Sequence, residues 1–155
     1  MNTGKTFEIR PARAEDLAPV RELLAQGLLP HEGLEEQFGP SYVVAQSDGK
    51  VVGVVGVERY GPFGLLRSAA TENSWRGRGV GQSLTRERIG WSRDQRLKAL
   101  YLLTTTAADF FARFGFREVE RPAVPEEIRG SREFAVACPE SAVVMTLPLG
   151  DDRPA

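Results

Sequence analysis

Arginines and glycines alternate in a short segment near the middle of the chain, Arg76-Gly77-Arg78-Gly79-Val80-Gly81. Glycine lets a backbone approach a ligand closely and take conformations that are closed to other residues. The residues that follow suit a helix, whose first N–H groups and positive dipole end favour a bound phosphate. The two arginines add charge-assisted hydrogen-bond donors for the same anion. The segment therefore predicts a site for a phosphate-bearing cofactor.

Other glycine-rich phosphate sites have different spacings. A P-loop requires lysine and then Ser or Thr after its last glycine, but Gln82 follows Gly81 here. The dinucleotide fingerprint has another glycine spacing and an acidic residue about 20 positions later, and no acid lies near Leu100. An RNA-binding arginine–glycine tract would be repeated, whereas this one occurs once. A capped surface turn without a ligand remains the alternative.

The elements around this segment predict how it is positioned. Residues 41–46 and 51–60 are rich in valine and flank Asp48-Gly49, which is a hairpin signal. A strand at 65–71 follows and completes an antiparallel meander. The helix that follows, with Val80, Leu84 and Trp91 on one face, leads to an apolar strand at 98–104. That strand should lie parallel to strand 65–71 in a right-handed βαβ unit.

The rest of the chain supplies further strands and helices. We expect an initial strand at 7–10, a helix from Ala14, an irregular substrate-side flap at 29–40, and a short apolar helix after residues 106–109, which have capping-box spacing. Strands at 116–119 and 142–147, short helices within 122–139 and a frayed tail at 150–155 complete the prediction. The predicted fold is α/β (α+β), a single domain over residues 1–155 with helices on both faces of a mixed sheet.

Composition excludes several classes of protein. Hydrophobic residues make up 41%, charged residues 26%, and the net charge is −1, so no field favours nucleic acid or an anionic membrane. No apolar stretch approaches the ~20 residues that span a bilayer, and the first residues lack the apolar run of a signal peptide. Cys138 is the only cysteine, which excludes an internal disulfide and favours a cytoplasmic location.

The pattern Arg/Gln-x-x-Gly-x-Gly/Ala at Arg76 to Gly81 resembles the pyrophosphate-binding motif of the GCN5-related N-acetyltransferases, or GNAT family, which bind acetyl-coenzyme A. The resemblance extends from Phe7 to about Leu149. Four shorter segments resemble the arsenic-resistance-associated acetyltransferases, and two of them also resemble the acetyltransferase domain of bacterial acetylglutamate synthases; the four are residues 64–68, 102–106, 110–116 and 138–145.

The resemblance implies a mostly antiparallel sheet of about six or seven strands, in which the central parallel pair splays apart. The pantetheine arm of the coenzyme would enter the gap and pair with the first strand of that pair. Acetyl-CoA would be the cosubstrate, with no metal. The implied coenzyme-binding residues are Ala70, Thr71, Arg76, Gly77, Arg78, Gly79, Val80, Gly81, Thr105, Phe110 and Phe111.

The implied reaction is direct attack of a primary amine on the thioester. The amine must lose a proton, and Glu72 and Glu58 are the candidate bases, although either could be an ordinary solvated carboxylate. Many relatives carry a tyrosine that protonates the departing thiolate, but this chain has Phe111 at that position. Tyr60, Cys138 or Ser141 could replace it, or coenzyme A could leave as a thiolate.

The implied acceptor is a small amino-acid-like molecule, either glutamate-like or a phosphinyl or arsenical analogue. Its carboxylate suits arginine, which binds carboxylates bidentately. The candidate substrate residues are Arg67, Ser68, Thr104 and Arg132, while His31 has no assigned role. The alternatives are a non-catalytic coenzyme-A-binding domain and an acetyltransferase of a peptide or protein amine. The resemblance also allows a homodimer.

Overall fold

The computed structural model describes residues 6–31, 33–131, 134 and 142–150. In this part of the chain, seven strands form one sheet in the order β1-β2-β3-β4-β5-β7-β6. Every neighbouring pair is antiparallel except β4 and β5, which confirms the predicted mixed, mostly antiparallel sheet. The strands are β1 Glu8–Pro11, β2 Tyr42–Ser47, β3 Lys50–Tyr60, β4 Phe63–Thr71, β5 Ala99–Thr104, β6 Arg117–Val119 and β7 Val143–Pro148.

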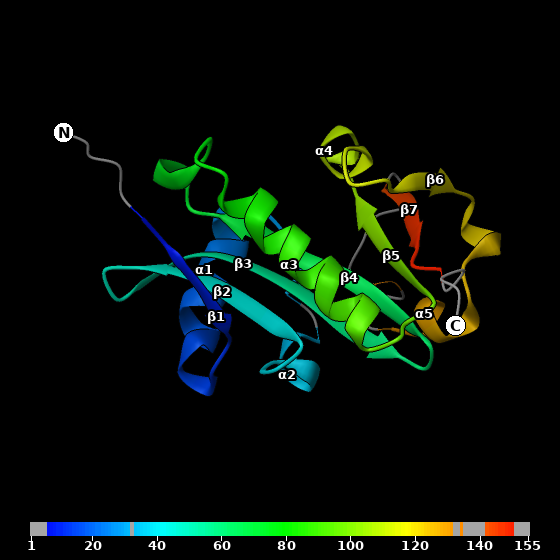
Figure 1. Ribbon diagram of the computed structural model, residues 1–155, viewed down its shortest axis with the longest axis horizontal. Helices are drawn as coiled ribbons and strands as arrows, with labels where there is room; N and C mark the ends of the chain where they lie inside the picture. The colour runs from blue at the N-terminus through cyan, green and yellow to red at the C-terminus, as the bar shows by residue number, and fades with distance from the viewer. Residues whose placement is uncertain (1–5, 32, 132–133, 135–141, 151–155) are drawn as a thin grey trace.

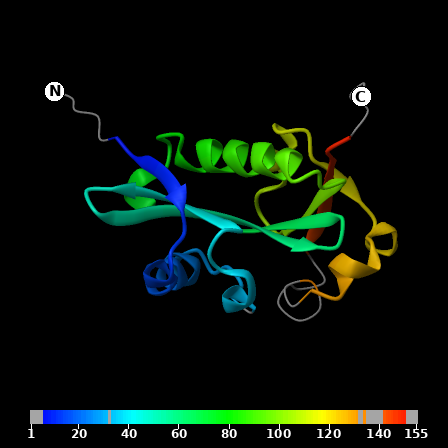
Figure 2. The same ribbon diagram turned by 60° about the horizontal axis from the view of Figure 1, so that its bottom comes forward.

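Helices cover both faces of the sheet (Figure 2). Helix α3 (Val80–Asp94) lies across one face, and α4 (Ala108–Ala112) packs into the same hydrophobic cluster. Helices α1 (Leu17–Gln26) and α2 (Leu34–Gln37) cover the other face (Figure 1). Helix α5 (Glu126–Arg129) covers a third cluster around Leu65 and Val144. No helix among the described residues has the length and apolar character needed to cross a lipid bilayer.

The predicted meander is present. Asp48 and Gly49 join β2 to β3 with φ values of 51° and 75°, and positive values at both positions are what the Asp-Gly hairpin signal predicts. β3 pairs along its length with β2 on one side and β4 on the other, and its middle is buried. It is therefore the central support of the antiparallel half of the sheet.

Of two local expectations, one is confirmed and one is wrong. Val80, Leu84 and Trp91 share a face of α3: Val80 and Leu84 are buried, and Trp91 packs against the same cluster with the guanidinium of Arg88 4.2 Å from its ring. Arg88 also donates to the carbonyl oxygens of Pro40 and Ser41, which ties α3 to the start of β2. The predicted capping box is not formed: the backbone N–H of Ala107 donates instead to Thr104 Oγ1, at 2.9 Å.

The parallel strands separate after a short contact. Residues 63–65 of β4 pair with residues 99–101 of β5, and beyond Leu65 no described pair joins the two strands. β5 continues alongside β7, while β4 continues alongside β3 (Figure 1). A β-bulge interrupts the β3–β4 register between Val54 and Gly56, and Ser68 lies in it with φ of 62°. The edge of β4 that faces β5 is thus left open from Leu66 to Thr71.

Candidate coenzyme and acceptor cleft

A cleft of about 900 Å³ lies where β4 and β5 diverge. Most of its lining comes from five places: residues 66–71 of β4, residues 102–104 at the end of β5 and the loop after it, the glycine turn with the start of α3, the aromatic side of α4, and the end of α1 with the loop after it. Segments far apart in the sequence therefore meet around one cavity.

The glycine turn forms one end of the cleft. Gly77 and Gly79 have φ values of 79° and 83°, so both positions use the freedom that only glycine provides at little cost. Gly79 immediately precedes α3, and Ser83 N–H donates to its carbonyl oxygen at 3.0 Å. The N–H groups of the three residues before Ser83 have no carbonyl of their own helix to bond, and no described side chain caps this end. The turn can therefore donate several backbone hydrogen bonds to an anion.

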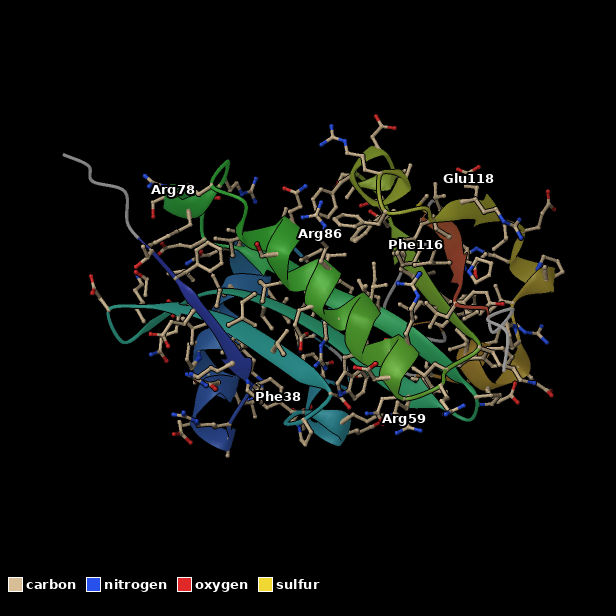
Figure 3. The ribbon with its side chains drawn as sticks, viewed as in Figure 1. Phe38, Arg59, Arg78, Arg86, Phe116 and Glu118 are labelled. Atoms are coloured by element: carbon tan, nitrogen blue, oxygen red, sulfur yellow. The ribbon has the colours of Figure 1, made fainter. Side chains whose placement is uncertain are left out.

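The two arginines of the motif behave differently. Arg76 lines the cleft. Arg78 does not: its guanidinium lies 5.4 Å from the ring of Trp75, and its Nε donates to the carbonyl of Ser74 at 3.3 Å. Figure 3 shows Arg78 on the segment before α3. Arg76 is thus the motif arginine that the structure brings to the cleft wall.

The predicted pantetheine wall lies together. Ala70, Thr71, Thr105, Phe110 and Phe111 all line the cleft. A Cβ built on Gly81 would lie 3.6 Å from Thr71 Oγ1 and 3.8 Å from Phe110 Cζ, so β4, α3 and α4 converge at this point. Phe110 and Phe111 pack edge to face with ring centroids 5.0 Å apart. Such a narrow, partly apolar channel beside an open strand edge fits a linear amide-containing arm.

Arg67, Ser68 and Thr104 form the other end of the cleft. Arg67 Nε donates to Ser68 Oγ, and Arg67 Nη2 donates to the carbonyl of Pro30 in the loop after α1, each at 3.2 Å. Its side chain has no exposed area. Arg132, the remaining predicted substrate residue, lies outside the described residues.

Glu58 lies behind Arg67 and does not line the cleft. Its carboxylate accepts hydrogen bonds from Tyr42 Oη at 2.5 Å and Tyr60 Oη at 2.7 Å, and pairs with Arg67 Nη1 at 3.7 Å. Burial, followed by the neighbouring Glu58 charge, raises the pKa of Tyr42 well above its usual range. Burial and the hydrogen bond to Glu58 also raise the pKa of Tyr60. Both hydroxyls therefore stay protonated and keep donating to Glu58.

Glu72 also lies outside the cleft lining, just beyond the end of β4. Lys50 Nζ is 2.7 Å from its Oε2, and Ser74 Oγ donates to its Oε1 at 2.6 Å. The hydrogen bond to Glu72 raises the pKa of Lys50. Neither predicted base is thus in direct contact with the cleft, and the role of each remains a prediction.

The lining also includes residues that were not predicted as site residues, among them Leu28 from the loop after α1 and Thr85 from α3. Thr85 could have been noticed because it is a polar residue on the buried face of α3. Leu29, Pro30 and His31, which begin the predicted substrate-side flap at 29–40, do line the cleft. The described lining carries Arg67 and Arg76 but no Asp or Glu, and Glu58 pairs with Arg67 from outside the lining. No described group of three or more His, Cys, Asp or Glu is placed to hold a metal ion.

A glycine turn at a helix start, opening onto a cleft between splayed parallel strands, defines a protein that binds a phosphate-bearing coenzyme in extended form. Residues 39–118 match the model of the acetyltransferase (GNAT) domain. The chain belongs to the GNAT acetyltransferase family, and it is an acetyl-CoA-dependent N-acetyltransferase.

Individual relatives agree with this assignment. An amino-acid acetyltransferase from Mycobacterium tuberculosis is 29% identical over 129 residues, covering 77% of this chain and 74% of that protein. The crystal structure of Rv2747 from Mycobacterium tuberculosis, a complex with CoA, superposes with a TM-score of 0.76 at 25% identity and covers 91% and 98% of the two chains. N-acetylglutamate synthase from Neisseria gonorrhoeae, complexed with coenzyme A and N-acetyl-glutamate, gives a TM-score of 0.78 at 22% identity. That match covers 96% of this chain and 36% of the synthase.

Proposed function

We propose that this acetyltransferase modifies the primary amine of a small amino-acid-like acceptor that carries a carboxylate, such as glutamate or a phosphinyl or arsenical analogue. The observation that carries the proposal is the pair of cations on the cleft wall: its described lining has two arginines and no carboxylate. In this proposal, Arg76 at the glycine turn binds the diphosphate of the coenzyme. Arg67, at the opposite end, is then the cation for an acceptor carboxylate.

The names of the relatives support the same acceptor class. One is an amino-acid acetyltransferase, and the synthase with the same fold was crystallised with N-acetyl-glutamate. The resemblance of residues 64–68 and 102–106 to the arsenic-resistance-associated enzymes adds arsenical analogues to the class. A cytoplasmic enzyme remains our expectation, and the family resemblance allows a homodimer.

The coenzyme supplies an acetyl thioester, whose carbonyl carbon forms the new C–N bond as its C–S bond breaks and the thiolate leaves. In the proposed arrangement, the helix start holds the diphosphate and the open edge of β4 orients the arm at Ala70 and Thr71. The bulge at Ser68 breaks the strand where the acceptor would meet the thioester. Because Glu58 and Glu72 lie outside the lining, each would take the amine proton through water, and Glu58 is paired with one lining residue, Arg67.

Thiol release tests the proposal. The protein is mixed with acetyl-CoA and a panel containing glutamate, other amino acids, phosphinothricin, an arsenical glutamate analogue and a peptide with a free N-terminus. We expect free CoA to appear with amino acids. The matched control is the best acceptor without its α-carboxylate. The KM for this amine should be at least about tenfold higher than the KM for the acceptor itself. Activity with the peptide alone would favour a peptide acetyltransferase, and no release despite CoA binding would favour the non-catalytic domain.

A further inference from the structure

The hydroxyl of Thr85 is buried in α3 without a hydrogen-bond partner. Among the described residues, its Oγ1 is the single buried side-chain nitrogen or oxygen for which no partner is found. Thr85 has no exposed surface, and it lines the cleft on the same helix as Val80 and Gly81. Thr85 is four residues beyond Gly81, so it lies about 6 Å further along the helix axis from the glycine turn.

This arrangement has no structural explanation within the chain. A threonine inside a helix usually bonds a carbonyl of the preceding turn or points to water, and Thr85 does neither. The lining also includes the apolar side chains of Leu66, Leu102 and Phe111. Valine has the same shape and would remove the cost of a buried unpaired hydroxyl. Packing alone therefore favours valine at position 85. The hydroxyl of Thr85 thus requires a hydrogen-bond partner from outside the described chain.

We infer that Thr85 Oγ1 forms a hydrogen bond with a polar group of the coenzyme's pantetheine arm, which makes Thr85 a coenzyme-binding residue that the glycine motif does not include. The inference rests on the proposed placement of the arm between β4 and β5. The diphosphate occupies the helix start, and the arm continues from there past the cleft side of α3, where Thr85 is the first buried polar side chain. The amides and the hydroxyl of the pantetheine arm can each form a hydrogen bond with a threonine hydroxyl, which is both a donor and an acceptor.

Calorimetry with coenzyme A and thermal unfolding of the free protein test the inference together. The variants are Thr85→Val, which removes the hydroxyl at constant shape, and Thr85→Ser, which keeps it. The matched control is Ser92→Ala on the same helix, where a buried hydroxyl donates to the carbonyl of Arg88 at 2.8 Å. Thr85→Val should bind coenzyme A about 5–20-fold more weakly while its free form is at least as stable as the parent. Thr85→Ser should stay within about threefold in affinity, and Ser92→Ala should lose stability without losing affinity.

A second ligand separates contact with the arm from contact with the phosphates. Adenosine 3′-phosphate 5′-diphosphate carries the phosphates of coenzyme A without the arm, and Thr85→Val should bind it as the parent does. If the parent binds coenzyme A and Thr85→Val binds it equally well, or if the variant loses affinity for both ligands alike, the inference is wrong while the proposed function stands. A destabilised free Thr85→Val protein would also contradict it. Failure of the parent to bind coenzyme A would instead overturn the proposed function.

Discussion

The two ends of the cleft are built from different kinds of groups. At the phosphate end, the donors are backbone N–H groups held by two glycines with positive φ. At the acceptor end, they are side chains held by a buried network in which Glu58 pairs with Arg67 and accepts from two tyrosines. Backbone donors depend on chain conformation within one short segment. The acceptor end depends on packing between β2, β3, β4 and the loop after α1.

This difference predicts what a substitution at each end of the cleft does to the protein. A change at the phosphate end should affect coenzyme affinity more than folding, because the glycine turn is exposed and little packs on it. A change in the buried network should affect folding as well as the acceptor, because the paired charges have 0–1% exposed area. The four predictions below test this contrast.

Replacing Glu58 should have the largest effect. Glu58→Gln removes the carboxylate that pairs with the buried guanidinium of Arg67, and breaking a buried pair from one side typically costs about 3–5 kcal/mol. Urea unfolding should show this loss, and Glu58→Gln with Arg67→Met should lose less than the sum of the single variants. Glu72→Gln is the control, because its pair with Lys50 is partly exposed and should contribute less than about 1 kcal/mol. Additive single effects would show that the network is not coupled.

Asp16 supports the helix that leads to the acceptor side, and its removal should be the next largest effect. Its Oδ2 accepts from Arg13 N–H at 2.7 Å and from Arg10 Nη1 at 2.8 Å, and the hydrogen bond with Arg10 lowers the pKa of Asp16. A lowered pKa in the folded state stabilises the protein above the unfolded pKa near 4, and this contribution is lost as pH falls through the folded pKa.

The expected loss for Asp16→Ala is therefore about 1–3 kcal/mol at pH 7, and it should shrink as the pH is lowered below 4. Denaturant unfolding at a series of pH values measures the loss of stability at pH 7 and its decrease at lower pH. Glu15→Ala, at an exposed neighbouring acid, should leave stability nearly unchanged at every pH. Parallel pH profiles for Asp16→Ala and the parent would contradict the role of this carboxylate.

The same contrast explains what could be predicted from sequence. The hairpin at Asp48-Gly49, the parallel strand after α3 and the glycine turn depend on local conformation, so glycines and apolar periodicity indicated them. The burial of Glu58 could not be predicted, because its partners come from residues 42, 60 and 67 and meet only when three strands pair. Thr104 gives a smaller example. Its hydroxyl oxygen accepts the backbone N–H of Ala107, the residue before α4, whereas the local pattern favoured a cap at Thr106.

Comparing Gly79→Ala with Gly49→Ala should distinguish the effect of backbone conformation on stability from the effect on coenzyme A binding. Gly79 has φ of 83° and Gly49, in the β2–β3 hairpin, has φ of 75°; a Cβ at either meets nothing within 4 Å. Alanine at either position should therefore cost about 1–2 kcal/mol of stability through the backbone alone. Calorimetry should show weaker coenzyme A binding for Gly79→Ala and unchanged binding for Gly49→Ala. Equal affinity for both variants would contradict a phosphate site at the start of α3.

Leu28→Gly should have the smallest effect on stability, and it should stabilise the protein, whereas the main variant of each other prediction destabilises it. α1 and α3 end in the same way, with a left-handed residue after the helix, Leu28 at φ 56° and Arg96 at φ 61°, where glycine is usually found. Glycine should stabilise both ends by about 0.5–1 kcal/mol. Leu28 is also 92% exposed and lines the cleft, so we expect Leu28→Gly to raise the acceptor KM while coenzyme affinity stays constant. Arg96→Gly should gain the same stability with no change in KM. If both variants kept the parent's KM, Leu28 would be a strained helix end that the acceptor does not contact.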